Sequence, residues 1–434
     1  MSNANITAQM LEFIQKSPTC FHAVSQLKEM LEAAGYREWK EAEDWKAEAG
    51  GKYYVTRNDS SLIALRIPVS EAIKGFAAVK GFHITASHSD SPAFKVKEAP
   101  ELTVEGQYVK LNTEKYGGMI LSTWLDRALS VAGRIVVKDA EGLASRLVNI
   151  DRDLLVIPNV AIHMNREINK GVEYNPQIDM LPLMAGGLEN GGKGALLALV
   201  AEEAGVKAED ILGHDLFLYV REPGKTIGLQ DEFVLSPRLD DLQCAYASMK
   251  AFVESKPQKY VNVCAVFDNE EVGSGTKQGA DSTFLEDVLM RAGEAMGVTV
   301  TGYRQLVAGS FLISADNAHG VHPNHPEKAD PTNRPYLNGG IVIKYHGSQK
   351  YTTDAYSAAK VKELCMRAGV PFQTFANRAD AVGGSTLGNI SASHVSVSSV
   401  DIGLPQLAMH SAVETAGAKD TEYCVRMLKT FYAE

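Results

Sequence analysis

The stretch FHITASHSD, residues 82–90, is an apolar run of strand-forming residues that ends in His88, Ser89 and Asp90. Two further runs, VNVCAVFDNEE and FLISAD, also end in acidic residues. Helical periodicity occurs between and around such runs, at residues 6–35, 239–253, 282–296, 356–368 and 412–432. Because parallel strands need a crossover connection, this alternation predicts an α/β domain with a mostly parallel sheet.

The pattern changes after about residue 95. Short strand-like segments separated by Gly, Asp and Asn occur at residues 103–112, 119–121, 134–137 and 154–162, and long helix is scarce before residues 195–203. An insertion of about 130 residues is large enough to form its own module. We therefore predict a discontinuous α/β domain, residues 1–94 and 231–434, interrupted by a β-rich domain at 95–230.

Composition excludes several partner classes. The chain of 434 residues carries a formal net charge of −10, which argues against nucleic-acid or anionic-membrane binding. It has no apolar run long enough to span a membrane, and the first residues lack the features of a signal peptide. The five cysteines form no CxxC pair, so we expect a reducing, cytoplasmic location without a disulfide framework.

Histidine and acidic residues recur where predicted strands end, which is where open α/β sheets place their sites. The candidates are His88, Asp240, Glu271, Asp316 and His410. Imidazole and carboxylate ligands without thiolate suit zinc, manganese or cobalt in a hydrolytic role. Paired metals require a bridging carboxylate, for which we choose Asp240.

Two neighbours of these candidates fit supporting roles. Asp90 is close enough in sequence to accept the second N–H of the His88 imidazole. Glu270 and Glu271 are adjacent, so one can bind metal while the other acts as general base.

Each candidate also has a plainer interpretation. A His-x-Asp sequence is usually a loop hydrogen-bond pair, Asp240 could be a helix N-cap, and a Glu-Glu pair is usually solvated surface. Taken singly these interpretations are favoured. Because the candidate residues recur at one predicted sheet edge, a metal site and the plainer interpretations are about equally favoured.

Eight motifs occur in the following order: SHSDSPAFKVK, WLDRALSVAGR, IPNVAIHMNREIN, SPRLDDL, FDNEEVGSG, SADNAHGVHPN, GGSTLGNI and DIGLPQLAMHSAVET. Together they resemble the M18 (aspartyl aminopeptidase) family of metallo-aminopeptidases. Each string alone is weakly specific, whereas the ordered series covers nearly the whole chain and is highly specific.

The resemblance implies a dinuclear aminopeptidase that acts on peptides with a free N-terminus. It implies that Asp240 bridges two divalent ions, zinc or alternatively manganese or cobalt. His88 and Asp316 would bind one ion, and Glu271 and His410 the other. It further implies that Glu270 is the general acid/base and that Asp90 supports His88.

The resemblance also implies an assembly. The inserted domain would make dimer contacts, and dimers would form a tetrahedral dodecamer. His163 matches a histidine that reaches a neighbouring subunit's site, although without the family we would interpret it as a packed histidine at a strand end.

Substrate preference depends on weaker matches. Lys344 resembles a lysine that could pair with an acidic N-terminal residue, and an exposed lysine in an edge strand is an equal alternative. Gly384, Ser385 and Thr386 would contact substrate or build a tight turn. Ala128 stands where the family often carries an acidic residue, which weakens transfer of fine specificity.

Three rival functions remain. A carboxypeptidase or deacylase could use the same scaffold, and a binding or structural assembly protein could keep the fold without turnover. The retention of Glu270 beside the ligand set argues against the second. A glycosidase using Glu270 would leave His88 and His410 without a role.

Overall fold

The computed structural model describes residues 6–69, 79–140, 142–381, 383–384 and 387–434. Contact clustering separates two compact units. The catalytic unit comprises Met1–Asp90, Gly224–Met409 and Glu414–Glu434, and the inserted unit comprises Ser91–Pro223 and His410–Val413. Each unit has its own sheets.

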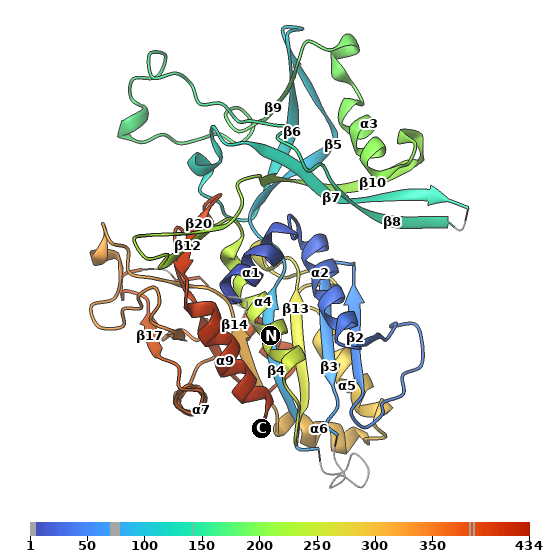
Figure 1. Ribbon diagram of the computed structural model, residues 1–434, viewed down its shortest axis with the longest axis vertical. Helices are drawn as coiled ribbons and strands as arrows, with labels where there is room; N and C mark the ends of the chain where they lie inside the picture. Colours follow the sequence, from blue (N-terminus) through green and yellow to red (C-terminus); the bar gives the residue numbers. More distant parts are fainter. Residues whose placement is uncertain (1–5, 70–78, 141, 382, 385–386) are drawn as a thin grey trace. The chain divides into compact units, whose positions relative to one another are not determined.

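A nine-stranded sheet forms the centre of the catalytic unit (Figure 1). Its order is β1 (Arg37–Glu38), β2 (Lys52–Arg57), β3 (Ser61–Arg66), β13 (Val261–Phe267), β4 (Phe82–His88), β14 (Phe311–Ala315), β18 (Ser398–Gly403), β16 (Ile341–Tyr345) and β17 (Phe372–Ala376). The four central strands β13, β4, β14 and β18 run parallel to one another, as predicted. Antiparallel pairs occur farther out, between β3 and β13 and between β16 and β18.

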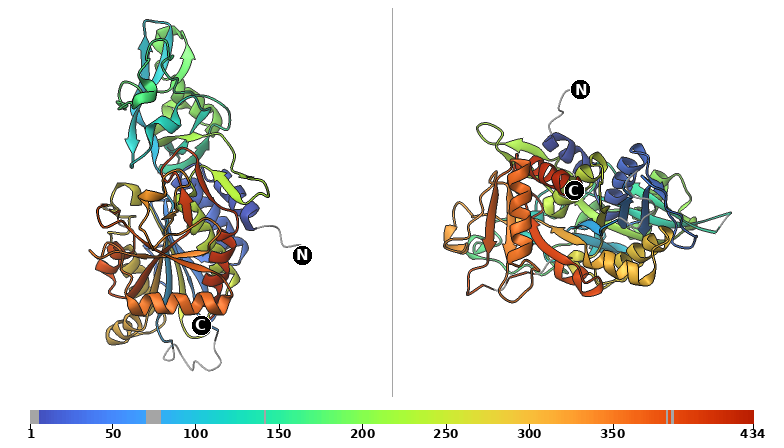
Figure 2. Two further views of the ribbon diagram at one scale, coloured as in Figure 1. Left: turned by 90° about the vertical axis from the view of Figure 1, so that its left-hand side faces the viewer. Right: turned by 90° about the horizontal axis from the view of Figure 1, so that it is seen from below.

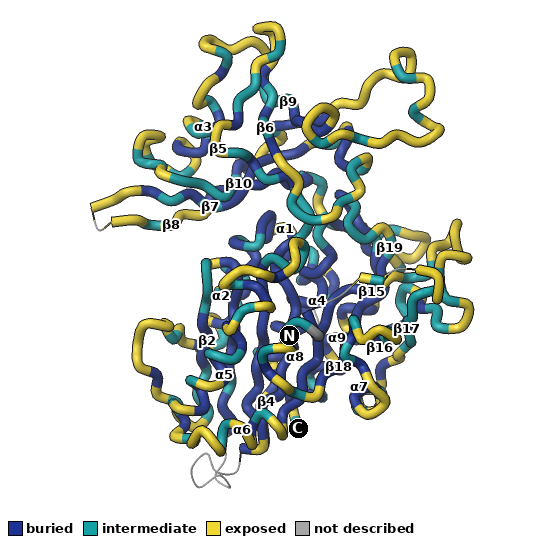
Figure 3. Tube along the Cα trace, turned by 180° about the vertical axis from the view of Figure 1, so that it is seen from behind, coloured by how far each residue is buried: buried dark blue, intermediate teal, exposed yellow. Residues whose placement is uncertain are grey.

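Both faces of this sheet are covered. Cys264 and Val266 of β13 pack into one apolar cluster, whereas Val263 and Ala265 pack into another. This period-two division explains why the central strands read as continuous apolar runs rather than alternating ones. Figure 3 shows the strands around β4 as a buried block.

Helices from distant parts of the chain supply the two clusters (Figure 2). The first cluster includes residues from α1 (Ile6–Gln15), α2 (Cys20–Ala33), α4 (Leu239–Glu254), α7 (Ala355–Ala368) and α9 (Asp420–Tyr432). The second includes residues from α5 (Phe284–Ala295), α6 (Val300–Ala308) and α8 (Leu387–His394). Among the described residues, no helix has the length and apolar character needed to cross a membrane.

A smaller sheet of five strands also belongs to the catalytic unit. Its order is β11 (Lys225–Ile227), β12 (Phe233–Ser236), β20 (Glu414–Gly417), β19 (Pro405–Leu407) and β15 (Ala318–His319). The segment His410–Val413, which belongs to the inserted unit, lies between β19 and β20 in the sequence. These two strands therefore hold the ends of the turn that carries His410.

The inserted unit is built on an antiparallel sheet of six strands. The order is β8 (Gly142–Asn149), β7 (Leu129–Asp139), β10 (Ile211–Val220), β5 (Ala93–Val104), β6 (Tyr108–Tyr116) and β9 (Leu183–Gly186). Helix α3 (Ala195–Ala204) contacts β8 and β5. Between β8 and β9 lies a long, mostly exposed loop, seen in yellow in Figure 3.

Several sequence-based boundaries are wrong. The strand predicted at 103–112 is a hairpin, because Glu105 and Gly106 have φ of 47° and 67° and turn the chain. The helix predicted at 6–35 is two helices, since Pro18 cannot continue the first. The helix predicted at 412–432 begins only at Asp420, after strand β20.

Candidate metal centre

Three parallel strands end at one edge of the large sheet. His88 is the last residue of β4, and its register partner Phe267 is the last residue of β13. Asp316 directly follows β14, which pairs with β4 on the other side. The parallel pairing therefore brings together polar residues that lie far apart in the sequence.

His88 is at the centre of a buried cluster of ligand atoms. Its Nε2 lies 3.3 Å from Oδ1 of Asp240 and 3.8 Å from Oδ1 of Asp316. His88, Asp241 and Asp316 each offer a ligand atom within 4.8 Å of one another, and so do His88, Glu270 and Glu271. The predicted residues thus gather at one place within the catalytic unit.

The start of α4 supplies Asp240 and Asp241. Both have non-helical backbone torsions, and the N-cap position belongs to Arg238, which makes no side-chain cap hydrogen bond. The main-chain N–H of Asp240 donates to Oε2 of Glu414 at 3.0 Å, which anchors this turn to β20.

Asp241 is a site residue that sequence reasoning missed. Its Oδ2 accepts a hydrogen bond from the main-chain N–H of His88 at 3.1 Å, and the residue is fully buried. The only sequence signal was its position beside Asp240 in the segment SPRLDDL.

Asp90 contacts both His88 and the Glu270–Glu271 pair. Its Oδ1 lies 3.3 Å from Nδ1 of His88, whose ring nitrogen is also 3.0 Å from the main-chain oxygen of Asp90. The two carboxylate oxygens accept the main-chain N–H groups of Glu270 and Glu271, each at 3.2 Å. Asp90 therefore orients the imidazole and the two glutamates together.

The electrostatics of the cluster favour bound cations. Burial, reinforced by neighbouring carboxylates, raises the pKa of Glu270 to about 8. Burial also raises the pKa of Asp241 and of Glu271 well above the usual range. Buried anions are costly unless they are paired or coordinate a metal. A donor set of imidazole and carboxylates without thiolate fits zinc or a similar divalent ion.

His88 responds to the same crowding. Burial opposes its charged form, but hydrogen bonds to Asp240, Asp316 and Asp90 outweigh burial and raise the pKa of His88 well above its usual value. A divalent ion between these groups would supply the positive charge that the protonated ring otherwise provides.

Lys344 lies beside this cluster. Its Nζ is 3.5 Å from Oδ2 of Asp316, and the residue is only 2% exposed. Strand β16, which carries Lys344, is paired on both sides. The interpretation as an exposed lysine in an edge strand is wrong.

The remaining predictions concern His163, His410, Gly384, Ser385 and Thr386. His163 is exposed in the long loop of the inserted unit, so the packed-histidine interpretation is wrong. His410 belongs to the inserted unit by contact clustering and has φ of 65°, and its main-chain oxygen accepts from Ile120. Gly384 is exposed, and Ser385 and Thr386 lie outside the described residues.

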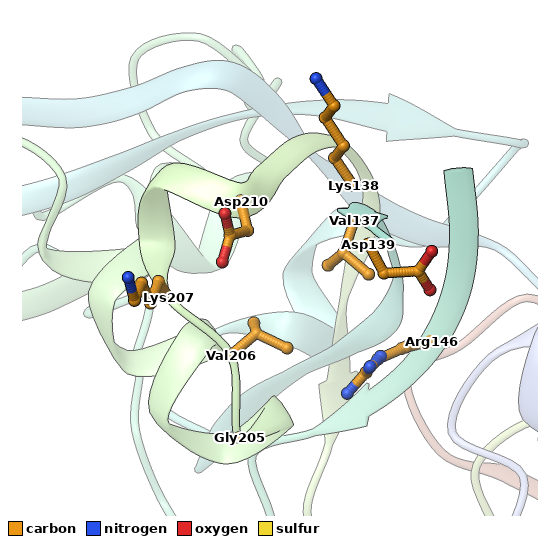
Figure 4. A pocket seen from close by; sticks show the side chains of 8 residues that line it. All are labelled: Val137, Lys138, Asp139, Arg146, Gly205, Val206, Lys207 and Asp210. Atoms are coloured by element: carbon orange, nitrogen blue, oxygen red, sulfur yellow. The ribbon is translucent and has the colours of Figure 1, made fainter. Parts of the chain in front are cut away.

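A separate cavity of about 540 Å³ occurs in the inserted unit (Figure 4). Lys138, Arg146, Lys207 and Asp210 contribute to its lining, and the figure shows the amines of both lysines directed away from it. None of the predicted site residues lines this cavity.

Comparison with known proteins connects the site to a family. The family described as Aminopeptidase I zinc metalloprotease (M18) matches residues 13–432. A probable M18 family aminopeptidase 2 of Clostridium novyi is 48% identical over 429 residues, which are 98% of each chain.

Solved structures resemble the whole chain. In the cryo-EM structure of the Ape4 and Nbr1 complex, the matched chain is 36% identical with a TM-score of 0.94, covering 99% of this chain and 85% of that one. In the structure of the mApe1 dodecamer of Saccharomyces cerevisiae, the matched chain is 29% identical with a TM-score of 0.85, covering 99% and 96%.

Proposed function

The chain belongs to the M18 family of zinc metallo-aminopeptidases, and we propose that it removes N-terminal residues from peptides with two divalent metal ions held around His88. The enzyme class follows from family membership. The number of ions, the residue roles and the substrate preference are the proposal. The observation that carries it is the cluster of ligand atoms around His88. The ligand atoms of His88, Asp241 and Asp316 lie within 4.8 Å of one another, and so do those of His88, Glu270 and Glu271.

In this proposal Asp240 bridges the ions. His88 and Asp316 bind one ion, and Glu271 and His410 bind the other. Support comes from the short distances between His88 and the two aspartates and from the ligand atoms that Asp240 and Glu271 offer within 4.8 Å of each other. His410 is proposed from the family motif.

Bound zinc ions would polarise the scissile carbonyl and lower the pKa of a water molecule. Glu270 is the proposed general base, which takes a proton from the attacking water and delivers it to the leaving amine. Asp90 keeps the His88 ring in place through its contact with Nδ1.

Cleavage only at N-termini has a coordination rationale. A free α-amino group can act as a ligand to a metal ion, whereas an acylated nitrogen cannot. We therefore propose that the free α-amino group of the peptide binds near the second metal ion. A carboxypeptidase would need a cationic site for the substrate carboxylate at the same place.

The substrate contacts are proposed from the sequence motifs. His163, from a neighbouring subunit, would stabilise the developing oxyanion, and its exposure in the long loop is compatible with this role. Gly384, Ser385 and Thr386 would line the substrate path. Lys344 is the candidate for pairing with an acidic N-terminal residue of the substrate. Its ammonium already contacts Asp316, which would compete with the substrate carboxylate.

We also propose a homo-oligomer. The mApe1 relative forms a dodecamer. In the inserted unit, Val160, Ile162, Met164 and Ile178 are between 51% and 82% exposed, an apolar surface that suits dimer contacts. Dimers formed through this unit would assemble into a tetrahedral dodecamer in the cytoplasm, where the five cysteines would stay reduced.

Hydrolysis of aminoacyl-p-nitroanilides carrying Asp, Glu, Leu or Lys tests the proposal. Chelation should abolish cleavage, and added zinc, manganese or cobalt should restore it. N-acetylated versions serve as the matched control and should remain intact. Cleavage of the blocked substrates would favour a deacylase or endopeptidase activity, and silence of folded, assembled protein with every metal would favour a binding scaffold.

A further inference from the structure

The Lys344 side chain is held in a closed environment. Its Nζ lies 3.5 Å from Oδ2 of Asp316 and 5.5 Å from the ring centroid of Tyr351. Only 3% of the side chain is exposed, compared with 11% for Asp316. A substrate carboxylate at the ammonium would therefore compete with Asp316 for it.

The two oxygens of Asp316 face different partners. Oδ2 contacts the ammonium of Lys344, whereas Oδ1 lies 3.8 Å from Nε2 of His88. The main-chain N–H of Asp316 donates to Ile402 at 3.2 Å, which fixes the backbone below the carboxylate. The lysine and the histidine therefore contact different oxygens of the same carboxylate.

The neighbouring strand leaves room for the lysine stem. A Cβ at Gly403 would lie 2.9 Å from Cε of Lys344 and 2.2 Å from the main-chain oxygen of Asp316. Gly403 is paired with Val342 across β18 and β16. Glycine at this position thus permits the close approach of lysine, aspartate and strand.

We propose that Lys344 is a positioning residue, which holds Oδ2 of Asp316 so that Oδ1 is presented to the metal centre. This inference rests on the proposed function, in which Asp316 is a metal ligand. The preference for acidic substrates, if present, then comes from other groups. Partners that orient metal ligands typically change metal affinity about 10–100-fold when they are removed.

The experiment compares the full-length wild type, K344M and K360M. Lys360 is the matched control, because it is a partly buried lysine of the same unit that pairs with Glu434 and lies over Phe311. Zinc affinity is measured by competition with a chromogenic chelator. Hydrolysis of Asp- and Leu-p-nitroanilide is measured at saturating zinc.

We expect K344M to bind zinc about 10–100-fold more weakly, with the ratio of Asp to Leu kcat/KM changed less than about twofold, and K360M to match the wild type. The visible spectrum of the cobalt-loaded protein should change in K344M, since a released Asp316 can bind through both oxygens. K344R, which keeps the positive charge, should recover part of the affinity and provides the test if K344M does not fold.

Unchanged zinc affinity and cobalt spectrum in K344M would overturn the inference. If the Asp to Leu ratio also collapsed, Lys344 would be a substrate contact. Failure of the wild type to bind zinc would instead overturn the proposed metal centre, so the two failures are distinguishable.

Discussion

Oδ1 of Asp90 lies 3.3 Å from Nδ1 of His88, while Nε2 of the same ring faces Asp240 and Asp316. The imidazole is thus held from one side and free to act as a ligand on the other. We expect D90N to weaken zinc binding and lower kcat/KM, each by about 10–100-fold. Chelator competition and p-nitroanilide kinetics measure both effects.

A control for this change is available in the same unit. Asp281 also contacts a histidine, with 2.9 Å between its Oδ1 and Nε2 of His394, but its side chain is half-exposed. D281N should leave zinc affinity and kcat/KM unchanged. Equal losses in both variants, or none in D90N, would contradict the role assigned to Asp90.

Glu270 is proposed to move the proton without being needed to hold metal. E270Q keeps the size of the side chain but cannot accept a proton, so kcat should fall by about 100–10,000-fold. Zinc affinity should change much less than kcat. E294Q, at an exposed position of α5, is the matched control and should be fully active. A parallel loss of zinc binding in E270Q would mark Glu270 as a ligand.

Much of the fold could be predicted because its central strands have a simple pattern. Strands β4, β13 and β14 are buried throughout and rich in apolar residues. His88 ends β4, and Asp268 and Asp316 directly follow β13 and β14, so the strands and the polar residues at their ends are visible in the sequence. The parallel sheet was predicted for the same reason.

The remaining errors concern pairing and turns. Lys344 was given an exposed edge position as an equal alternative, because periodicity does not reveal that β16 gains a second neighbour in β17. The hairpin at Glu105 and Gly106 was missed because the residues around its turn are as strand-forming as those within the strands. Asp241 was missed because its partner is a main-chain N–H, which no side-chain motif records.

Asp241 is expected to support His88 through the backbone. In D241A the buried N–H of His88 loses its acceptor, which should lower the free energy of unfolding by about 1–3 kcal/mol. Because this N–H belongs to the candidate metal ligand, zinc affinity should fall as well. D44A, at an exposed position, is the control. Wild-type stability and zinc affinity in D241A would show that the contact is dispensable.

His83 gives the protein a pH-dependent stability away from the metal centre. Its ring is stacked between Tyr260 and Phe431, with centroid distances of 3.7 and 4.2 Å, and Nδ1 lies 3.0 Å from the main-chain oxygen of Phe431. Burial, with the nearby charge of Lys360, lowers the pKa of His83 from 6.5 to about 3. The folded state therefore resists protonation that the unfolded chain accepts.

The sign follows from the lowered pKa. Above pH 6.5 both states are neutral at His83, and as pH falls from 6.5 toward 3 the unfolded state gains the proton first. Stability should therefore decline on acidification by about 1.4 kcal/mol per pH unit from this group. Between pH 7 and pH 5, the free energy of unfolding, measured by urea denaturation, should fall by about 2 kcal/mol less in H83Q than in the wild type. H322Q, which replaces an exposed histidine, should follow the wild type. Parallel pH dependence in H83Q and the wild type would show that the His83 ring is protonated in the folded protein as readily as in the unfolded chain.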